Sequence, residues 1–358
     1  MLKDFYKDKK ILITGHTGFK GSWLSQVLFS FGADVIGVSL EPNTTPALFS
    51  VLEQQKKLNH NIVDIRDYQK LKQVFLEQKP EIVFHLAAQP LVRESYDNPL
   101  YTFETNIIGT ANVLQAVKET NSTKAVVVIT TDKVYENKEQ DTCFKESDRL
   151  AGHDPYSSSK VSAEIITDCY IKSFFNSKVN SETLIASSRA GNILGGGDWA
   201  SERLITDIVR AVFEQNIPPT IRSPKAVRPW QFVLESLYGY LMLAQKLFDK
   251  QTQFSGAWNF GPDIENCIPV EQVIQKALNV LGKKDYKIRK LDDIKHEAGV
   301  LMLDNQKAKD VLTWQPILNI DEAIAMTMEW YKRFYNKEDI IEFTQKQIDY
   351  FFKKCQIT

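Results

Sequence analysis

Two short groups of polar residues carry the chemistry that this chain could do. Tyr156 and Lys160 are four residues apart, which places a phenol and an ammonium group on one face of a helix. Such a pair can take the proton of a hydroxyl group while a nicotinamide takes the hydride. Thr131, Asp132 and Lys133 stand together earlier in the chain and add a second acid–base couple. The combination suggests oxidation coupled to a further proton transfer, such as elimination of water.

The helix that carries the first pair has a clear start. Asp154 followed by proline is an N-cap acceptor followed by the residue that the first helical position tolerates. Tyr156 and Lys160 therefore lie in its first turns, where we expect the ammonium and the positive nicotinamide ring to lower the tyrosine pKa from about 10 toward neutrality. Thr131 is placed to hydrogen-bond the hydroxyl that Tyr156 deprotonates, and Asp132 to donate a proton to a leaving hydroxide.

A glycine-rich loop near the N-terminus predicts a dinucleotide site. Gly15 allows a tight turn, Gly18 lets the backbone approach a pyrophosphate, and Gly21 lets the following helix pack on its strand. The free N–H groups and positive end of that helix favour phosphate. The spacing is GxxGxxG rather than the common GxGxxG. Within this loop we expect cofactor contacts from Gly15, His16, Gly18, Phe19, Lys20 and Gly21.

The sequence leaves the choice between NAD and NADP open. The end of the second strand should carry an acid for the adenosine ribose, and Ser39 stands there instead. Glu41 is a possible substitute, whereas Lys20 offers a cation to a 2′-phosphate. Asp64 is a candidate partner of the adenine amino group, with a solvated carboxylate as the equally weighted alternative.

Bulk properties exclude several function classes. The 358 residues carry a net charge of −1, which does not favour nucleic acid or an anionic membrane. The four cysteines are scattered and suit reduced thiols rather than a disulfide or a metal, so we expect no metal site. The charged N-terminus does not resemble a signal peptide, and no apolar run reaches the roughly 18 residues of a membrane span. We expect a cytoplasmic enzyme.

Strand and helix patterns alternate through the first half of the chain, which predicts an α/β fold with a doubly wound parallel sheet. After Arg189 glycine and proline break this rhythm, and helical patterns predict a smaller, mainly helical substrate lobe. We assign 1–190 to a dinucleotide-binding domain that 231–262 rejoins, and 191–230 with 263–358 to the lobe. The expected strands cover 11–14, 35–38, 82–86, 126–130 and 184–186, and the expected helices 21–31, 68–78, 102–119, 156–175, 203–215, 234–247, 269–281 and 318–334.

With these residues in hand, the chain resembles the Rossmann-type extended short-chain dehydrogenase/reductases, and among them the nucleotide-sugar 4,6-dehydratases that act on CDP-glucose. The resemblance runs nearly from end to end. It rests on Thr14–Trp23, His85–Arg93, Thr131–Lys133, Tyr156–Lys160, Arg189–Trp199, Arg228–Gln231 and Trp258–Gly261.

The resemblance implies an NAD enzyme that converts CDP-D-glucose to CDP-4-dehydro-6-deoxy-D-glucose in deoxysugar biosynthesis. Thr131, Tyr156 and Lys160 would then serve C4 oxidation, and Asp132 the loss of the C6 hydroxyl. Further cofactor contacts would come from Asp64, Ile65, Leu86, Ala87, Ala88 and Asn106, beside Tyr156 and Lys160. Substrate contacts would come from Gln89, Arg93, Asn192, Asp198, Trp199, Arg228, Asn259 and His296.

Several points stay open. Sister dehydratases carry Asp-Glu where this chain has Asp132 and Lys133, so the base at C5 is unassigned; Lys133 could serve only if neutral. A nucleotide-sugar 4-epimerase uses the same tyrosine–lysine pair but needs no acid for a leaving group. A non-catalytic dinucleotide sensor is a second alternative. Relatives pair two helices per subunit, so we expect a homodimer or tetramer.

Overall fold

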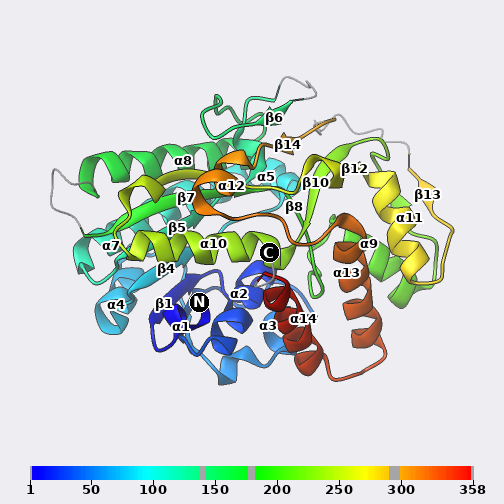
Figure 1. Cartoon of the computed structure of the whole chain (residues 1–358), viewed down its shortest axis with the longest axis horizontal. Helices are drawn as coiled ribbons and strands as arrows, with labels where there is room; N and C mark the ends of the chain where they lie inside the picture. Colours follow the sequence, from blue (N-terminus) through cyan, green and yellow to red (C-terminus); the bar gives the residue numbers. More distant parts are fainter. Residues whose placement is uncertain (1, 138–141, 176–181, 290–298, 356–358) are drawn as a thin grey trace.

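The computed structural model describes residues 2–137, 142–175, 182–289 and 299–355, and Figure 1 shows its elements. Seven strands form one parallel sheet in the order β11-β7-β5-β4-β1-β2-β3. The order reverses between the neighbours β1 and β4, which is where doubly wound sheets bind ligands. The strands are β1 (Lys10–Thr14), β2 (Asp34–Ser39), β3 (Asn59–Ile62), β4 (Ile82–His85), β5 (Ala125–Ile129), β7 (Leu184–Ala190) and β11 (Gly256–Phe260).

Helices cover both faces of this sheet, and the strand sequences reflect that. Successive side chains of a strand point to opposite faces, so Val83 packs in one apolar cluster and Phe84 in the other. Both side chains are fully buried. The cluster around Val83 includes residues of α4 (Tyr68–Gln78), α7 (Gly109–Thr120) and α8 (Pro155–Phe174), and that around Phe84 includes α2 (Phe19–Ser30) and α10 (Val233–Phe248).

Two of the predicted helices contain a π-helical turn. The helix expected over 102–119 consists of α6 (Pro99–Phe103), the π-helix η2 (Glu104–Ile108) and α7. The one expected over 203–215 consists of α9 (Leu204–Val209) and the π-helix η5 (Arg210–Gln215). Such turns often mark functional sites, and η2 carries Asn106. Hydrophobic periodicity does not reveal them.

The substrate lobe contains more strand than expected. A three-stranded sheet runs in the order β12-β10-β8, and β13 pairs with β9 in a separate two-stranded sheet. These strands are β8 (Asn192–Leu194), β9 (Thr220–Ile221), β10 (Val227–Phe232), β12 (Cys267–Pro269) and β13 (Lys287–Ile288), flanked by α9, α11 (Val270–Val280) and α13 (Ile320–Tyr335). Strand β10 leads directly into α10, which returns the chain to the large sheet (Figure 1). The domain boundaries themselves stay a prediction.

The sequence patterns do not predict the last long helix, α14 (Ile340–Cys355). This helix contacts α2 and α13, so the C-terminal part of the chain lies beside the helix that follows the first strand (Figure 1). None of the helices in the described ranges is long and apolar enough to cross a membrane. The remaining short elements are α1 (Leu2–Tyr6), α3 (Leu48–Val51), η1 (Gln54–Lys56), α5 (Val92–Asp97), η3 (Asp132–Val134), β6 (Cys143–Phe144), η6 (Thr252–Phe254), η7 (Ile264–Asn266), β14 (Met302–Leu303) and α12 (Gln306–Leu312).

Candidate active site

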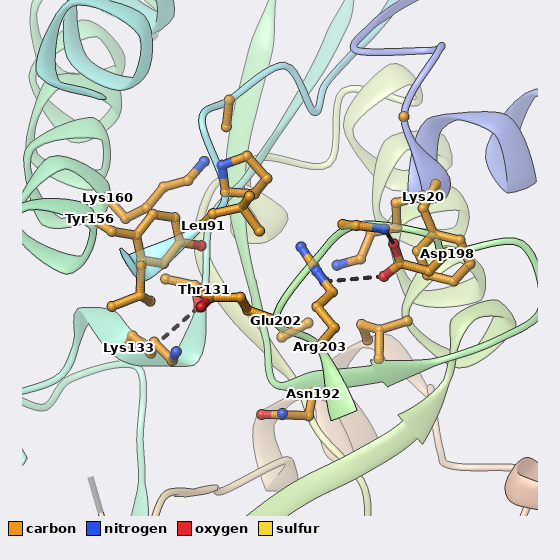
Figure 2. A pocket seen from close by; sticks show the side chains of 18 of the residues that line it. Lys20, Leu91, Thr131, Lys133, Tyr156, Lys160, Asn192, Asp198, Glu202 and Arg203 are labelled. Atoms are coloured by element: carbon orange, nitrogen blue, oxygen red, sulfur yellow. Dashed lines mark hydrogen bonds and ion pairs between the residues drawn. The ribbon is translucent and has the colours of Figure 1, made fainter. Parts of the chain in front are cut away.

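One cavity of about 810 Å³ lies over the carboxyl ends of the central strands. The glycine loop after β1, the loops after β4 and β5, and the start of α8 line it on the sheet side. The loops around β8 and β10 line it on the lobe side. In Figure 2, Tyr156, Lys160 and Thr131 lie to one side of the cavity and Lys20 and Asp198 to the other.

The glycine loop has the backbone geometry that a bound pyrophosphate requires. Gly15 has a φ of +78°, and a β-carbon there would lie 2.7 Å from the main-chain nitrogen of Ala87. A β-carbon on Gly21 would lie 2.2 Å from the carbonyl oxygen of Gly15. Gly18 is the N-cap of α2, and no side chain caps that end. The first N–H groups of α2 are therefore available to phosphate oxygens.

The adenosine end of the cavity favours no 2′-phosphate. Thr17 and Ser39 share a hydrogen bond of 2.8 Å at the end of β2, and Glu41 lines the cavity beyond them. Asp64 also lines it, with an oxygen 2.6 Å from a guanidinium nitrogen of Arg66. The Arg66 hydrogen bonds and charge outweigh burial and lower the pKa of Asp64. The cavity is also lined by four further residues that we predicted as cofactor contacts, Ile65, Leu86, Ala87 and Ala88.

Lys20, the possible partner of a 2′-phosphate, contacts α10 in this structure. Its ammonium donates a hydrogen bond to the Tyr240 hydroxyl at 3.2 Å, on α10. Its positive charge adds to the burial that lowers the pKa of Lys160 and opposes the burial that raises the pKa of Asp132.

Tyr156 and Lys160 are held by the cap of α8. Asp154 accepts a hydrogen bond from the Ser157 N–H at 2.9 Å in a capping box. The expected lowering of the Tyr156 pKa is wrong for this structure, because burial raises that pKa to about 12, while a hydrogen bond to Thr131 and the charge of Arg203 oppose the rise.

The Lys160 ammonium donates to the carbonyl oxygen of Ile129 at 3.2 Å. Burial and the neighbouring charge of Lys20 lower the pKa of Lys160 to about 8. The pair is therefore phenol and ammonium near neutral pH and loses its first proton in the mildly alkaline range.

Asp132 is arranged as a proton donor. Its side chain is 2 % exposed, and burial raises its pKa against the charges of Lys133 and Arg228. Thr131 donates a hydrogen bond to Oδ1 at 3.0 Å, while Oδ2 is buried and without a partner in the described residues. A buried oxygen that lines a cavity and lacks a protein partner suits a ligand hydroxyl.

A buried ion pair behind these residues joins three elements. Glu164, one turn after Lys160 on α8, lies 2.9 Å from the Arg189 guanidinium on β7. Thr130, at the end of β5, donates to Glu164 at 2.5 Å, and Ser187 donates at 2.6 Å. The pair therefore fixes the segment that carries Thr131 and Asp132 against the helix that carries Tyr156.

Part of the predicted substrate set lines the cavity. Arg93, Asn192, Asp198, Trp199 and Arg228 are all among its lining residues. Arg93 approaches Glu202 at 3.4 Å, and Asp198 approaches Arg203 at 3.5 Å. Several arginines thus line one cavity, and guanidinium groups suit a diphosphate.

Comparison with known proteins identifies the family. The model of the GDP-mannose 4,6 dehydratase family matches residues 12–327. The chain belongs to this family. It is 44 % identical to a CDP-glucose 4,6-dehydratase of Salmonella typhimurium over 349 residues, covering 97 % of each chain. It is 26 % identical to a UDP-glucuronate 4-epimerase of Thermodesulfobacterium geofontis, covering 90 % of this chain and 95 % of the relative.

Solved structures confirm the fold of this family member. The dTDP-glucose 4,6-dehydratase DesIV of Streptomyces venezuelae, with NAD and TYD bound, superposes with a TM-score of 0.78. The identity is 21 %, over 92 % of this chain and 99 % of DesIV. The UDP-glucose 4-epimerase of Thermus thermophilus in complex with NAD gives 0.76 at 22 % identity, over 90 % and 98 %. The expected doubly wound α/β fold is therefore correct.

Four predicted contact residues of this family member do not line the cavity. The His16 ring is buried, with Nε2 2.7 Å from Nδ1 of His60. Asn106 and Gln89 hydrogen-bond each other through Asn106 Oδ1 and the Gln89 N–H at 2.8 Å. Asn259 accepts from the Tyr135 hydroxyl at 2.7 Å. In this structure their side chains hold the loops behind the site, and a role at the ligand stays a prediction. His296 lies outside the described residues.

Sequence reasoning missed many lining residues, among them the charged Glu202, Arg203 and Arg222. The positive charge of Arg203 opposes the rise in the pKa of Tyr156, although the two residues are far apart in sequence. In the sequence these residues are recognisable only as charged residues in irregular segments, and charge alone does not distinguish a binding site from a solvated loop. No group of three potential metal ligands occurs in the described part of the chain.

Proposed function

We propose that the protein is an NAD-dependent CDP-D-glucose 4,6-dehydratase, a hydro-lyase that forms CDP-4-dehydro-6-deoxy-D-glucose and water. The observation that carries this proposal is the buried Asp132 close to the tyrosine–lysine pair, whose Oδ2 has no partner among the residues that the structure describes. An oxidation alone needs no second acid. We infer that the nucleotide carries cytidine from the similarity of this chain to the CDP-glucose 4,6-dehydratase of Salmonella typhimurium.

The glycine loop and the residues after β2 and β4 fit a dinucleotide, as the close approach of Gly15 to Ala87 indicates. When bound, NAD supplies a nicotinamide that takes the hydride from C4 and returns it to C6. The phosphates would lie on the N–H groups at the start of α2. Glu41 would accept from the adenosine ribose.

The chain's own residues move the protons. Tyr156, as phenolate, takes the proton of the C4 hydroxyl as the C4–H bond breaks, and Lys160 stabilises the phenolate. Thr131 orients that hydroxyl. With C4 a ketone, the C5 proton is acidic and leaves to a base, for which we propose Lys133 in its neutral form. The C6–O bond breaks as Asp132 gives its proton to the departing hydroxide, which forms water.

Return of the hydride to C6 and of a proton to C5 completes the product, so no net oxidant is consumed. Arg93, Asn192, Asp198, Trp199 and Arg228 would hold the nucleotide diphosphate and its sugar. We also propose a homodimer or tetramer in the cytoplasm.

The purified protein should be incubated with CDP-, dTDP-, GDP- and UDP-glucose, and the nucleotide sugars followed by mass. Loss of one water from CDP-glucose is the expected result. A 4-epimer without loss of water would assign the protein to the epimerases instead. No turnover of any of the four would leave the dinucleotide sensor as the better reading.

A further inference from the structure

Helix α8 begins with one backbone N–H group that its own capping residue does not bind. The capping box joins the Ser157 N–H to the Asp154 side chain, and the Ser158 N–H donates to the Asp154 carbonyl oxygen at 2.9 Å. Pro155 has no N–H group. The N–H of Tyr156 is the remaining donor of this first turn. Because Tyr156 is buried, its N–H needs an acceptor from outside the helix.

Ser95 on α5 supplies that acceptor. The Tyr156 N–H donates to Oγ of Ser95 at 3.1 Å, although the two residues are 61 positions apart in the chain. Ser95 is fully buried, and its hydroxyl donates to the carbonyl oxygen of Val92 at 2.6 Å. Since a serine hydroxyl has a single hydrogen, the contact with Val92 leaves the oxygen as an acceptor for Tyr156. The direction of both hydrogen bonds is thereby fixed.

This contact joins the tyrosine of the site to one wall of the cavity. Helix α5 follows β4 and lines the cavity through Val92, Arg93 and Tyr96, whereas Ser95 points to α8 and does not line it. Arg93 would hold the nucleotide sugar in the function proposed above. Proton transfer needs the phenol within hydrogen-bond reach of the C4 hydroxyl, so a small shift of the start of α8 against α5 lowers the rate.

We propose that Ser95 is a positioning residue for oxidation at C4. It acts through Tyr156, whose main chain it holds so that the phenolate meets the C4 hydroxyl of the bound sugar. Ser95 exchanges no proton and no electron with the substrate. This role rests on the dehydratase function proposed above and adds to it a residue that neither lines the cavity nor belongs to the tyrosine–lysine pair.

Ser95→Ala and Ser236→Ala are a matched pair of variants. Ser236 is also fully buried on a helix, α10, and its hydroxyl donates to the carbonyl oxygen three residues earlier, that of Val233, at 3.1 Å. Ser95 makes the same kind of bond to Val92. Both variants lose this bond within a helix, but only Ser95→Ala also takes the acceptor away from the N–H of Tyr156.

The single-turnover rate of nicotinamide reduction, measured against the concentration of CDP-glucose, tests the proposal. In Ser95→Ala the plateau rate should fall roughly 10-fold, the size expected for a buried donor that loses its acceptor. The half-saturating concentration, and the binding of CDP measured by calorimetry, should not change. Ser236→Ala should change neither quantity. Ser95→Thr keeps the hydroxyl and should keep the wild-type plateau.

An unchanged plateau in Ser95→Ala would overturn the proposal. So would equal losses in Ser95→Ala and Ser236→Ala, because the loss would then come from general destabilisation, and so would a Ser95→Thr plateau as low as that of Ser95→Ala. If Ser95→Ala does not fold, Ser95→Cys, whose sulfur is a weak acceptor, carries the same prediction. If the wild type reduces no nicotinamide with CDP-glucose, the proposed function fails first; if it does and the plateau is insensitive to Ser95, the role of Ser95 fails alone.

Discussion

The Thr131 hydroxyl donates a hydrogen bond to Oδ1 of Asp132 at 3.0 Å, and this contact determines which carboxyl oxygen remains for a ligand. Oδ2 is the buried oxygen without a partner in the described residues. It lies close to Gly191: a β-carbon there would be 3.1 Å from it. A glycine at 191 thus leaves room beside the oxygen that we expect to protonate hydroxide.

Asp132→Asn should therefore separate the two halves of the reaction. The amide keeps the shape and the contact with Thr131 but is a far weaker acid, so water loss should fall roughly 100-fold or more. Oxidation at C4 should continue, because Tyr156 and Lys160 are untouched. Rapid mixing with CDP-glucose should show reduced nicotinamide accumulating. Water loss at the wild-type rate in this variant would remove Asp132 from the mechanism.

The pH dependence of C4 oxidation should depend on Lys160. Burial raises the pKa of Tyr156 to about 12 and lowers that of Lys160 to about 8, so near neutral pH the pair is phenol and ammonium. The reaction needs the phenolate beside the ammonium, which is a minor form of the pair once it has lost one proton, so the rate should rise with pH as that proton leaves. In Lys160→Met the cation that stabilises phenolate is lost, and the rise should move to more alkaline pH.

The measurement is the single-turnover rate of nicotinamide reduction between about pH 6 and 10, with Lys172→Met as the control. Lys172 is an exposed lysine on the same helix that pairs with Asp168. A profile in Lys160→Met that parallels the wild type would assign the titration to another group.

Lys133 is our candidate for the base at C5. It lines the cavity directly after Asp132, and the sister dehydratases' glutamate is absent there. Lys133→Met should stop exchange of the C5 hydrogen with deuterated water and leave transfer of hydride from C4 intact. Exchange is read by mass in the recovered nucleotide sugar. Undiminished exchange would place the base elsewhere.

The sequence predicted the sheet side of the site better than the lobe side. The central strands are continuous apolar runs, and their carboxyl ends carry Thr131, Asp132 and the glycine loop in short, regular connections. Arg203 and Glu202, by contrast, reach the cavity from an irregular segment whose path depends on tertiary packing. Hydrophobic periodicity gives no information about the path of such a segment.

A residue's place in a family motif also does not show whether its side chain contacts a ligand or holds the protein around the site. His16 belongs to the glycine loop, yet its ring packs against His60 and not into the cavity. Asn259 belongs to a motif that matches the family, yet it ties Tyr135 to β11. In both, a buried polar side chain has a hydrogen-bond partner inside the protein, and the sequence does not show which residue that partner is.

Glu164→Ala should destabilise the fold strongly. It would leave the Arg189 guanidinium buried without its counter-charge, at a cost of about 3–5 kcal/mol in the free energy of unfolding. Urea denaturation measures the change. The matched control is Asp168→Ala, on the same helix, whose partner Lys172 is 73 % exposed and whose loss should cost less than about 1 kcal/mol. Equal effects of the two variants would contradict a special role for the buried pair.

The predicted self-association can be tested on one apolar surface. Leu100, Ile108 and Ile165 are 74 %, 53 % and 60 % exposed, and their elements α6, η2 and α8 contact one another. Exposed apolar side chains on neighbouring elements favour an interface. Ile165→Asp should therefore lower the mass found by sedimentation to that of a monomer, because the carboxylate would have to lose its water in the interface. Ile217→Asp changes an isoleucine of similar exposure, 52 %, elsewhere and should leave the mass unchanged. A wild-type monomer, or an Ile165→Asp oligomer of wild-type mass, would show that this surface does not hold the subunits together.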